Sequence, residues 1–388
     1  MLVEREISNL FSKIAEVYPI VAVVGPRQAG KTTFLKEQLQ KNDGVYLLFD
    51  DPDIRNIFDE DIKKFERQYL SSGKVVVFDE VNYASSAGKN LKYLADTGSK
   101  IWITSSSELI LGQSVLSHLV GRVSIMRLFP FNNVEFLRYK NIYTENTKIL
   151  SRELEEHIIY GGYPKVVTTS DIELKNIILR DLYETLLLKD IAYSFSIDDI
   201  ASLEKFAYYL SVNTGTQLTY EAVSQTLGLT FLTIKKYLEA MEKSYFIFTV
   251  TPFFTNKNKE IAKQPKIYLA DTGIRNMILK TKVIDGKVFE NYIASELVRY
   301  GFKPKYWRTK GQAEVDFIIE NGKEIIPIEV KLSNANITNG LRSFIREYKP
   351  KIAFQITLNG EEAEHEYQDC LIKVVTIVKG FEELKGYL

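Results

Sequence analysis

Five short apolar runs alternate with polar, helix-like stretches over the first third of the chain. The runs are Ile20–Val24, Val45–Phe49, Val75–Phe78, Ile101–Ile103 and Val123–Leu128. Each is too short for a buried helix and is bounded by glycine, charged or turn residues. Continuously apolar strands separated by helices are typical of a parallel sheet that is covered on both faces. The pattern therefore predicts a five-stranded α/β domain over residues 1–140.

Beyond residue 140 the pattern changes three times. Residues 141–199 read as helices with a Gly-Gly-Tyr-Pro break at 161–164, which predicts a helical connector or lid. Residues 200–270 read as three helices and a hairpin, the arrangement of a winged-helix module. Residues 271–388 return to mixed α/β, with a helix through Glu290 and Glu296 and several strands. We therefore expect an α/β protein of four parts.

Composition narrows the range of functions. The 388 residues carry 50 Lys plus Arg and 50 Asp plus Glu, so any contact with nucleic acid must come from local patches. The single cysteine, Cys370, excludes an intramolecular disulfide, and the three histidines lie far apart, which disfavours a zinc hydrolase. No signal peptide and no long uncharged apolar stretch is visible. We expect a soluble cytoplasmic protein with no membrane contact.

The segment after the first run fits the phosphate-binding pattern GxxxxGK[ST]. Glycines let backbone N–H groups turn toward phosphates, and the start of the following helix adds positive potential. Lys31 is expected to reach the β and γ phosphates of ATP, and the Thr32 hydroxyl to bind Mg²⁺. A chance glycine turn is the alternative, which the flanking strand and helix disfavour. The residues expected to contact the nucleotide here are Gly25, Pro26, Arg27, Gln28, Ala29, Gly30, Lys31, Thr32 and Thr33.

Two carboxylates end the third apolar run. Asp79 closes the predicted strand, where a carboxylate can reach the nucleotide and its magnesium. Glu80 follows directly and could act as general base toward the attacking water. Acidic residues are common at strand ends, so this pair indicates a nucleotide site only in combination with the phosphate-binding segment. Together the two segments predict a bound nucleotide that the protein hydrolyses.

Two further roles are open on sequence grounds. A polar residue among Thr104–Ser107, with Ser106 as our choice, could contact the γ-phosphate or the water, or the serines could simply cap a helix. Arg122 could act as an arginine finger, a role that contributes about 10³–10⁵ in rate, or it could be an ordinary surface arginine. A finger that acts on another copy of the chain would require a homo-oligomer.

Residues 230–244 have the pattern of a recognition helix. Phe231, Ile234, Leu238 and Met241 fall on one face, with Tyr237 at its edge. The residues expected on a groove-reading face are Thr233, Lys236, Ala240 and Lys243, and those expected to contact phosphates from the wing are Lys257, Lys259 and Lys263. Glu239 and Glu242 dilute the charge, and a protein–protein spacer is the alternative to DNA binding.

Carboxylates and a lysine recur on two predicted strands near the C-terminus. Because strand residues alternate between faces, Asp316 on one strand and Glu329 and Lys331 on the next could meet. Asp316 and Glu329 are ligands that suit Mg²⁺, and Lys331 could orient water or stabilise charge. An exposed face of alternating charges is the alternative. The basic, aromatic stretch at 299–310 could track a nucleic-acid backbone or be a solvated strand face.

The order of these parts resembles bacterial and archaeal AAA-type ATPases that carry a C-terminal domain of unknown function with a PD-(D/E)XK, restriction-endonuclease-like core. The resemblance covers nearly the whole chain. The segments that carry it are VVGPRQAGKTT at 23–33, VVVFDE at 75–80, ITSSS at 103–107, GR at 121–122, PFNNVEF at 130–136, YGGYP at 160–164, ADTGIRN at 270–276, FEN at 289–291, YWRTKGQAEVDFII at 306–319 and IEVK at 328–331. Ser105 departs from the glycine expected before the sensor serines.

The resemblance implies ATP binding and hydrolysis and a nuclease-type centre. The residues it implies are Lys31, Thr32, Asp79 and Glu80 for ATP and Glu290, Asp316, Glu329 and Lys331 for the nuclease-type centre, with Glu290, Asp316 and Glu329 as metal ligands. The leading hypothesis is an ATPase with a magnesium-dependent, DNA-handling, nuclease-like C-terminal region. The alternative is an ATP-switched DNA-binding or signalling protein in which the nuclease-like part is an inactive scaffold.

Overall fold

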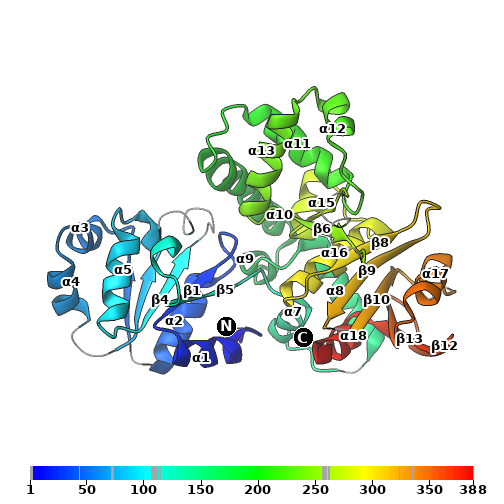
Figure 1. The fold of residues 1–388 in the computed structure, drawn as a ribbon, viewed down its shortest axis with the longest axis horizontal. Helices are drawn as coiled ribbons and strands as arrows, with labels where there is room; N and C mark the ends of the chain where they lie inside the picture. The colour runs from blue at the N-terminus through cyan, green and yellow to red at the C-terminus, as the bar shows by residue number, and fades with distance from the viewer. Residues whose placement is uncertain are drawn as a thin grey trace. The chain divides into compact units, whose positions relative to one another are not determined.

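The computed structural model describes residues 3–42, 44–70, 74–105, 112, 115–144, 146–255, 260, 263–322, 324–333 and 336–387. The chain folds into two compact units (Figure 1), one made of residues 1–131 with 243–245 and the other of residues 132–242 with 246–388. Among the residues described, no helix is long and apolar enough to cross a membrane.

The first unit contains the predicted parallel sheet. Its strands are β1 (Ile20–Val24), β2 (Val45–Leu48), β3 (Val76–Asp79), β4 (Ile101–Ser105) and β5 (Val123–Arg127). They run in the order β2-β3-β4-β1-β5, and every pair is parallel. Its helices are α1 (Ser8–Val17), α2 (Lys31–Asn42), α3 (Pro52–Glu60), α4 (Ile62–Tyr69), η1 (Val81–Tyr83), α5 (Ala87–Asp96) and η2 (Leu116–His118). The five predicted strands are thereby confirmed.

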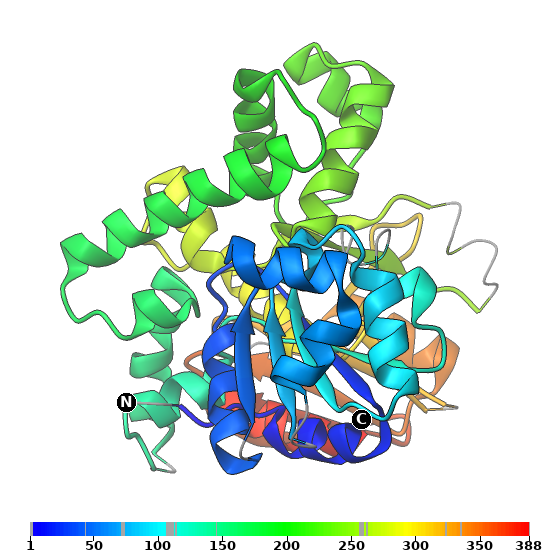
Figure 2. The ribbon, with the colours of Figure 1, turned by 90° about the vertical axis from the view of Figure 1, so that its left-hand side faces the viewer.

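Alternation along β1 explains why helices cover both faces of this sheet (Figures 1 and 2). Ile20, Ala22 and Val24 pack into the cluster that α3, α4 and α5 complete, whereas Val21 and Val23 pack into the cluster of α1 and α2. All five side chains are fully buried. Parallel strands place their carboxyl ends at one edge of the sheet, so the segments that follow β1 and β3 lie at the same edge.

The second unit is larger and contains a mixed sheet of eight strands. The strands are β6 (Ile247–Pro252), β7 (Lys266–Leu269), β8 (Lys305–Arg308), β9 (Glu314–Asn321), β10 (Glu324–Lys331), β11 (Ile352–Thr357), β12 (Ala363–Tyr367) and β13 (Cys370–Thr376). Their order is β12-β13-β11-β10-β9-β8-β6-β7. The helices are α7 (Asn133–Tyr139), α8 (Thr147–Tyr160), α9 (Pro164–Val167), α10 (Ile172–Thr185), η3 (Leu186–Tyr193), α11 (Ile200–Val212), α12 (Tyr220–Leu227), α13 (Phe231–Lys243), α15 (Thr272–Leu279), α16 (Gly286–Arg299), α17 (Asn339–Tyr348), α18 (Ile377–Leu384) and η4 (Lys385–Tyr387).

The divisions expected at residues 140, 199 and 270 differ from this arrangement. The first unit ends at residue 131, and one apolar cluster takes residues from α8, α10, α11, α13 and α15. The hairpin of β6 and β7, expected to be a wing, joins the C-terminal sheet through the parallel pairing of Thr251 with Lys305. The expected connector and winged-helix parts therefore share a core, and their hairpin is an edge of the sheet beyond residue 300.

Candidate functional site

The loop between β1 and α2 has the backbone of a phosphate cradle. Gly25 and Gly30 have φ angles of 150° and 96°, and Gln28 between them has a φ of 61°. A Cβ on Gly25 would lie 2.1 Å from the Leu128 carbonyl oxygen, so this position has room only for glycine. The expected nucleotide-binding residues 25–33 occupy this loop and the first turn of α2.

Lys31 begins α2 and is turned back onto the loop. Its Nζ donates hydrogen bonds of 2.9 Å to the carbonyl oxygens of Gly25 and Pro26, and its side chain is buried. The ammonium thus lies at the helix N-terminus, where backbone N–H groups also favour an anion. A phosphate oxygen is a stronger acceptor than either carbonyl and could replace them.

Asp79 ends β3 and accepts hydrogen bonds from three hydroxyl groups. The Thr32 hydroxyl donates to Oδ2 at 2.8 Å, the Tyr46 hydroxyl also donates to Oδ2, and the Thr104 hydroxyl donates to Oδ1. Tyr46 lies on β2 and Thr104 on β4, the two neighbours of β3. Burial and the hydrogen bond to Asp79 raise the pKa of Tyr46, so its proton stays on the hydroxyl. A hydroxyl and a carboxylate in contact are a donor set that suits Mg²⁺.

Glu80 follows Asp79 in a strained backbone conformation. Its φ and ψ are 54° and 43°, a left-handed conformation that costs a non-glycine residue energy. Its backbone N–H donates to the Thr104 hydroxyl at 2.9 Å. Thr104 therefore contacts both halves of the Asp79–Glu80 pair. Ser105 is buried in β4, and Ser106, our choice for the sensor, lies outside the described residues.

Arg122 lies at the opposite edge of the sheet from the phosphate cradle. The Ile20 N–H donates to its carbonyl oxygen, and Ile20 pairs with Val123 at the amino ends of β1 and β5. The cradle follows the other end of β1, about 13 Å away at about 3.3 Å per residue. The guanidinium pairs with Asp96, with Nε 2.6 Å from Oδ1. Arg122 thus cannot be a finger for the cradle of its own chain.

The C-terminal carboxylates and their lysine come together on β9, β10 and α16. Phe317 pairs with Ile328 in antiparallel register, which puts Asp316 beside Glu329. The Lys331 Nζ lies 2.9 Å from Glu329 Oε2 and 3.8 Å from Asp316 Oδ2. Burial and the charge of Asp316 raise the pKa of Glu329 to about 7 and raise the pKa of Glu290 above its ordinary value. Asp316 therefore acts electrostatically on both glutamates.

Sequence reasoning missed Lys266, which enters the same cluster from β7. Its Nζ lies 3.1 Å from Glu290 Oε1 and 2.5 Å from Glu314 Oε1. Within the part of the chain that the structure describes, no group of three or more His, Cys, Asp or Glu is arranged to hold a metal ion. The expected ligands Glu290, Asp316 and Glu329 are thus close together, but in this arrangement their partners are lysines.

A groove of about 760 Å³ lies beside this cluster. Its lining includes Lys263, Arg308 and Lys310 with one acidic residue, Glu347. Arg308 also lies 3.4 Å from Glu314, a partner of Lys266, so the groove and the cluster share a wall. The basic residues of the stretch at 299–310 do not form one surface, however, because Arg299 is buried inside the unit.

The recognition-helix expectation for α13 needs correction. Ala240, expected on the groove-reading face, is fully buried, whereas Phe231, expected in the core, is 58% exposed. The Lys236 Nζ donates to the Ser196 carbonyl oxygen at 2.7 Å. The buried face is centred on Ile234, Tyr237 and Met241, because the helix packs against α11 with this side. Lys257 and Lys259 lie outside the described residues.

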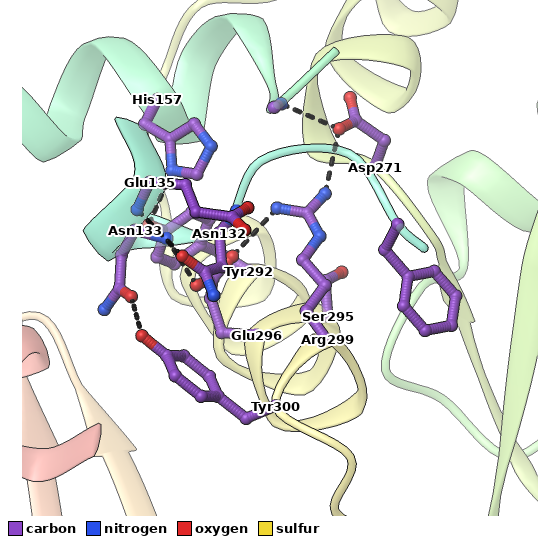
Figure 3. A network of polar contacts seen from close by, with 12 residues as sticks. Asn132, Asn133, Glu135, His157, Asp271, Tyr292, Ser295, Glu296, Arg299 and Tyr300 are labelled. Carbon is purple, nitrogen blue, oxygen red and sulfur yellow. Dashed lines mark hydrogen bonds and ion pairs between the residues drawn. The ribbon is translucent and has the colours of Figure 1, made fainter. Parts of the chain in front are cut away.

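A second polar network, which sequence reasoning did not assign, lies buried in the larger unit (Figure 3). The Arg299 guanidinium lies 2.9 Å from Asp271 and 2.8 Å from Glu296. Glu296 also accepts the Asn133 N–H at 2.7 Å, and Asp271 accepts the Gly162 N–H at 2.9 Å. This network joins three of the segments quoted above for the family resemblance, those at 130–136, 160–164 and 270–276, and its Arg299, Asp271 and Glu296 side chains are buried, so they could not meet a substrate.

Comparison with known families divides the chain in three. Residues 17–137 match a family model described as an AAA domain. Residues 151–284 and 285–379 match two models, each described as a domain of unknown function. The first match supports an AAA-type, ATPase-like domain, and the other two describe no activity.

The similar curated proteins carry no described function. An uncharacterized protein of Methanocaldococcus jannaschii is 28% identical over 365 residues, which cover 89% of this chain and 80% of that protein. An uncharacterized protein of Haemophilus influenzae is 24% identical, with 85% of this chain and 87% of that protein covered. Among solved structures, the Walker-type ATPase of Pyrococcus abyssi is 15% identical, with a TM-score of 0.48 and coverage of 72% of this chain and 96% of that chain. This TM-score is too low to establish a common fold.

Proposed function

We propose that this protein binds ATP with Mg²⁺ at the loop of residues 25–30 and hydrolyses it. The observation that carries the proposal is the 2.8 Å contact between Thr32 and Asp79, at the start of the helix whose first residue, Lys31, turns its ammonium onto the loop. Lys31 would hold the β and γ phosphates, and Thr32 and Asp79 would hold Mg²⁺. The metal would supply neutralisation of phosphate charge.

Glu80 takes the role of general base in this proposal. It would accept a proton from the water that attacks the γ-phosphorus, and the bond from that phosphorus to the bridging oxygen would break to give ADP and phosphate. Thr104 would fix the positions of Asp79 and Glu80, because its hydroxyl donates to one and accepts from the other. Arg122 would act only from a second copy of the chain.

Two variants test the ATPase proposal. Lys31→Ala should abolish ATP binding in calorimetry, because the loop loses the charge that pairs with the phosphates. Glu80→Gln should bind ATP normally and lose turnover by about 10²-fold or more. Unchanged turnover in Glu80→Gln would remove the base role from this residue, and no ATP binding by the wild type would end the proposal as a whole.

For the C-terminal region we propose a DNA-handling role at the carboxylate cluster. Its support is the basic groove that shares a wall with Glu314 and Lys266. With Mg²⁺ or Mn²⁺ the protein would cut DNA, and Asp316→Ala or Lys331→Ala would stop the cutting. A stimulation of ATP hydrolysis by DNA would link this region to the ATPase.

The second candidate is a protein whose ATP-dependent switching uses the C-terminal region as an inactive scaffold. The observation that favours it is the pairing of the carboxylates with Lys266 and Lys331. If the wild type cuts no single-stranded, duplex or branched DNA while it hydrolyses ATP, this candidate replaces the nuclease-like one.

A further inference from the structure

Lys266 is held firmly at the edge of the eight-stranded sheet. It pairs with Val250 of β6 on one side and with Gln217 through an isolated bridge on the other. Only 3% of its side chain is exposed. A long, charged side chain is seldom buried to this extent unless its charge is matched inside the protein.

The Lys266 ammonium is paired with two carboxylates, those of Glu290 and Glu314. Its Nζ is 3.1 Å from Glu290 Oε1 and 2.5 Å from Glu314 Oε1. The Tyr268 hydroxyl donates to the same Glu290 oxygen at 2.6 Å. The turn at Gly215 keeps this arrangement tight, since a Cβ there would lie 3.3 Å from Glu290 Oε1.

The two remaining carboxylates of the cluster are also engaged by the protein. Asp316 Oδ2 accepts the Val330 N–H at 2.8 Å and lies 3.8 Å from the Lys331 Nζ. Glu329 pairs with Lys331 and accepts the Thr338 hydroxyl at 3.0 Å. The protein itself therefore supplies the positive charges and the hydrogen-bond donors that these carboxylates contact.

A divalent ion fits poorly into this arrangement. Mg²⁺ needs oxygen ligands at about 2.1 Å in a near-octahedral set, several of them charged. Here Glu290 faces an ammonium that would stand within a few ångströms of the ion, and like charges at such a distance repel strongly in a buried site. The carboxylates meet the charge requirement of a metal site only if Lys266 is absent or displaced.

We propose that the Lys266 ammonium takes the place of a divalent cation at Glu290 and Glu314, near the charge of Asp316, and so keeps the C-terminal site free of metal in this conformation. The proposal rests on the proposed function only in treating the cluster as the working site of the C-terminal region. Cutting of DNA would then require that Lys266 leaves the carboxylates, whereas the scaffold alternative needs no such step.

Binding of Mn²⁺ to the full chain without nucleotide tests this directly, by the loss of the free-ion signal in electron paramagnetic resonance. The wild type should have no Mn²⁺ site that depends on Asp316. Lys266→Met should gain one such site, with Mn²⁺ bound at least about tenfold more tightly than any residual binding by the wild type. Adding Asp316→Asn to Lys266→Met should remove the gain, and Lys266→Arg, which keeps a cation there, should not show it.

A matched control is Lys305→Met. Lys305 lies on β8 of the same sheet and also pairs with two glutamates, 2.8 Å from Glu260 and close to Glu320. Its removal should create no Mn²⁺ site that depends on Asp316, because Lys305 pairs with Glu260 and Glu320 and not with the carboxylates that Lys266 holds. A gain in Lys305→Met equal to that in Lys266→Met would mean that any loss of a lysine has this effect, and the proposal would fail.

Two other results overturn the proposal. A wild-type Mn²⁺ site that disappears in Asp316→Asn would show that Lys266 does not exclude metal, and this measurement does not depend on the folding of a lysine variant. The second result is a Lys266→Met protein that is folded, as circular dichroism verifies, and binds no Mn²⁺. It would show that Lys266 is not what keeps metal out of the site. Neither result touches the ATPase proposal, which is tested by ATP binding at Lys31.

Discussion

Asp79 receives more hydrogen bonds than its place at the end of a strand would require. Hydroxyls from α2, β2 and β4 all donate to its two oxygens. Charge-assisted hydrogen bonds of this kind fix a carboxylate in position. Before any nucleotide arrives, the carboxylate that we assign to Mg²⁺ is thus already oriented by its neighbours.

Thr104 is the neighbour whose loss should matter most for turnover. Thr104→Val keeps the shape of the side chain but removes the hydroxyl that donates to Asp79 and accepts from the Glu80 N–H. We expect turnover to fall by about 10–100-fold with ATP affinity changed by less than about threefold, because Glu80 loses its fixed position.

Steady-state hydrolysis and calorimetric ATP binding check this prediction. Tyr46→Phe serves as the comparison, because it removes a hydroxyl from Asp79 alone and should cost less turnover. Equal losses in the two variants would mean that the contact to Glu80 contributes nothing.

Glu296 makes the stability of the protein depend on pH near neutrality. Its full burial raises its pKa from 4.5 to about 7, although Arg299 opposes the shift. Between these two pH values the folded chain holds a proton that the unfolded chain has lost, so stability falls as the pH rises from about 4.5 to 7. Above about pH 7 this contribution stays lost.

The prediction is that Glu296→Gln flattens this part of the stability curve. Urea midpoints measured between pH 5 and pH 7.5 should fall with pH in the wild type and change less in the variant, since glutamine does not titrate. Glu184→Gln, on an exposed part of α10, is the control and should leave the slope as it is. A slope that is the same in Glu296→Gln and the wild type would contradict the assignment.

At the scale of elements, the buried network of Figure 3 explains why distant segments meet. Asn132 caps α7 through a capping box with Glu135, and Asp271 caps α15, while both helix starts are tied to α16 through Glu296 and Arg299. Gly161 must be glycine here, since a Cβ would lie 1.9 Å from Asp271 Oδ1. Through Glu296 and Asp271, Arg299 therefore connects the start of α7, the turn after α8 and the start of α15.

Arg299→Met should destabilise the protein strongly. It removes the cation between Asp271 and Glu296 and leaves two buried carboxyl groups without it, a loss that typically costs about 3–5 kcal/mol. Arg180→Met is the matched control, because Arg180 also lies near two acidic residues but is 58% exposed, and exposed pairs contribute about 0–1 kcal/mol. Chemical denaturation of both variants gives the comparison, and similar losses would refute the role of burial.

The sequence predicted well where the strands of the first unit lie along the chain, but it did not predict which strands and side chains are neighbours in space. Apolar runs with defined ends located the five strands of the first unit, and the phosphate-binding pattern located the cradle. Strand order is not written in such runs, so the contacts of Tyr46 with Asp79 across β2 and β3 could not be foreseen. Lys266 was missed for the same reason, because a lysine that begins a strand reads as solvent-exposed until the sheet it joins is known.

At the scale of the molecule, the position of Arg122 limits how the proposed ATP hydrolysis could use this residue. The parallel register puts Arg122 at the amino ends of the strands and the cradle at their carboxyl ends. If Arg122 acts on ATP at all, it acts on the ATP of another copy. The Asp96 carboxylate that now holds its guanidinium would have to release it at that interface.

Mixing two inactive variants tests this arrangement. Arg122→Ala and Glu80→Gln should each hydrolyse ATP at least about tenfold more slowly than the wild type. The first variant lacks the arginine finger, and the second lacks the general base. In an equimolar random mixture, about a quarter of the sites would combine an intact Glu80 with an intact Arg122 from the neighbour, so about a quarter of the wild-type turnover should return. Arg122→Ala mixed with the double variant Glu80→Gln, Arg122→Ala supplies no finger and should regain nothing. Full turnover by Arg122→Ala alone would remove this residue from the reaction, because a site that works without the guanidinium does not need a second copy to provide it.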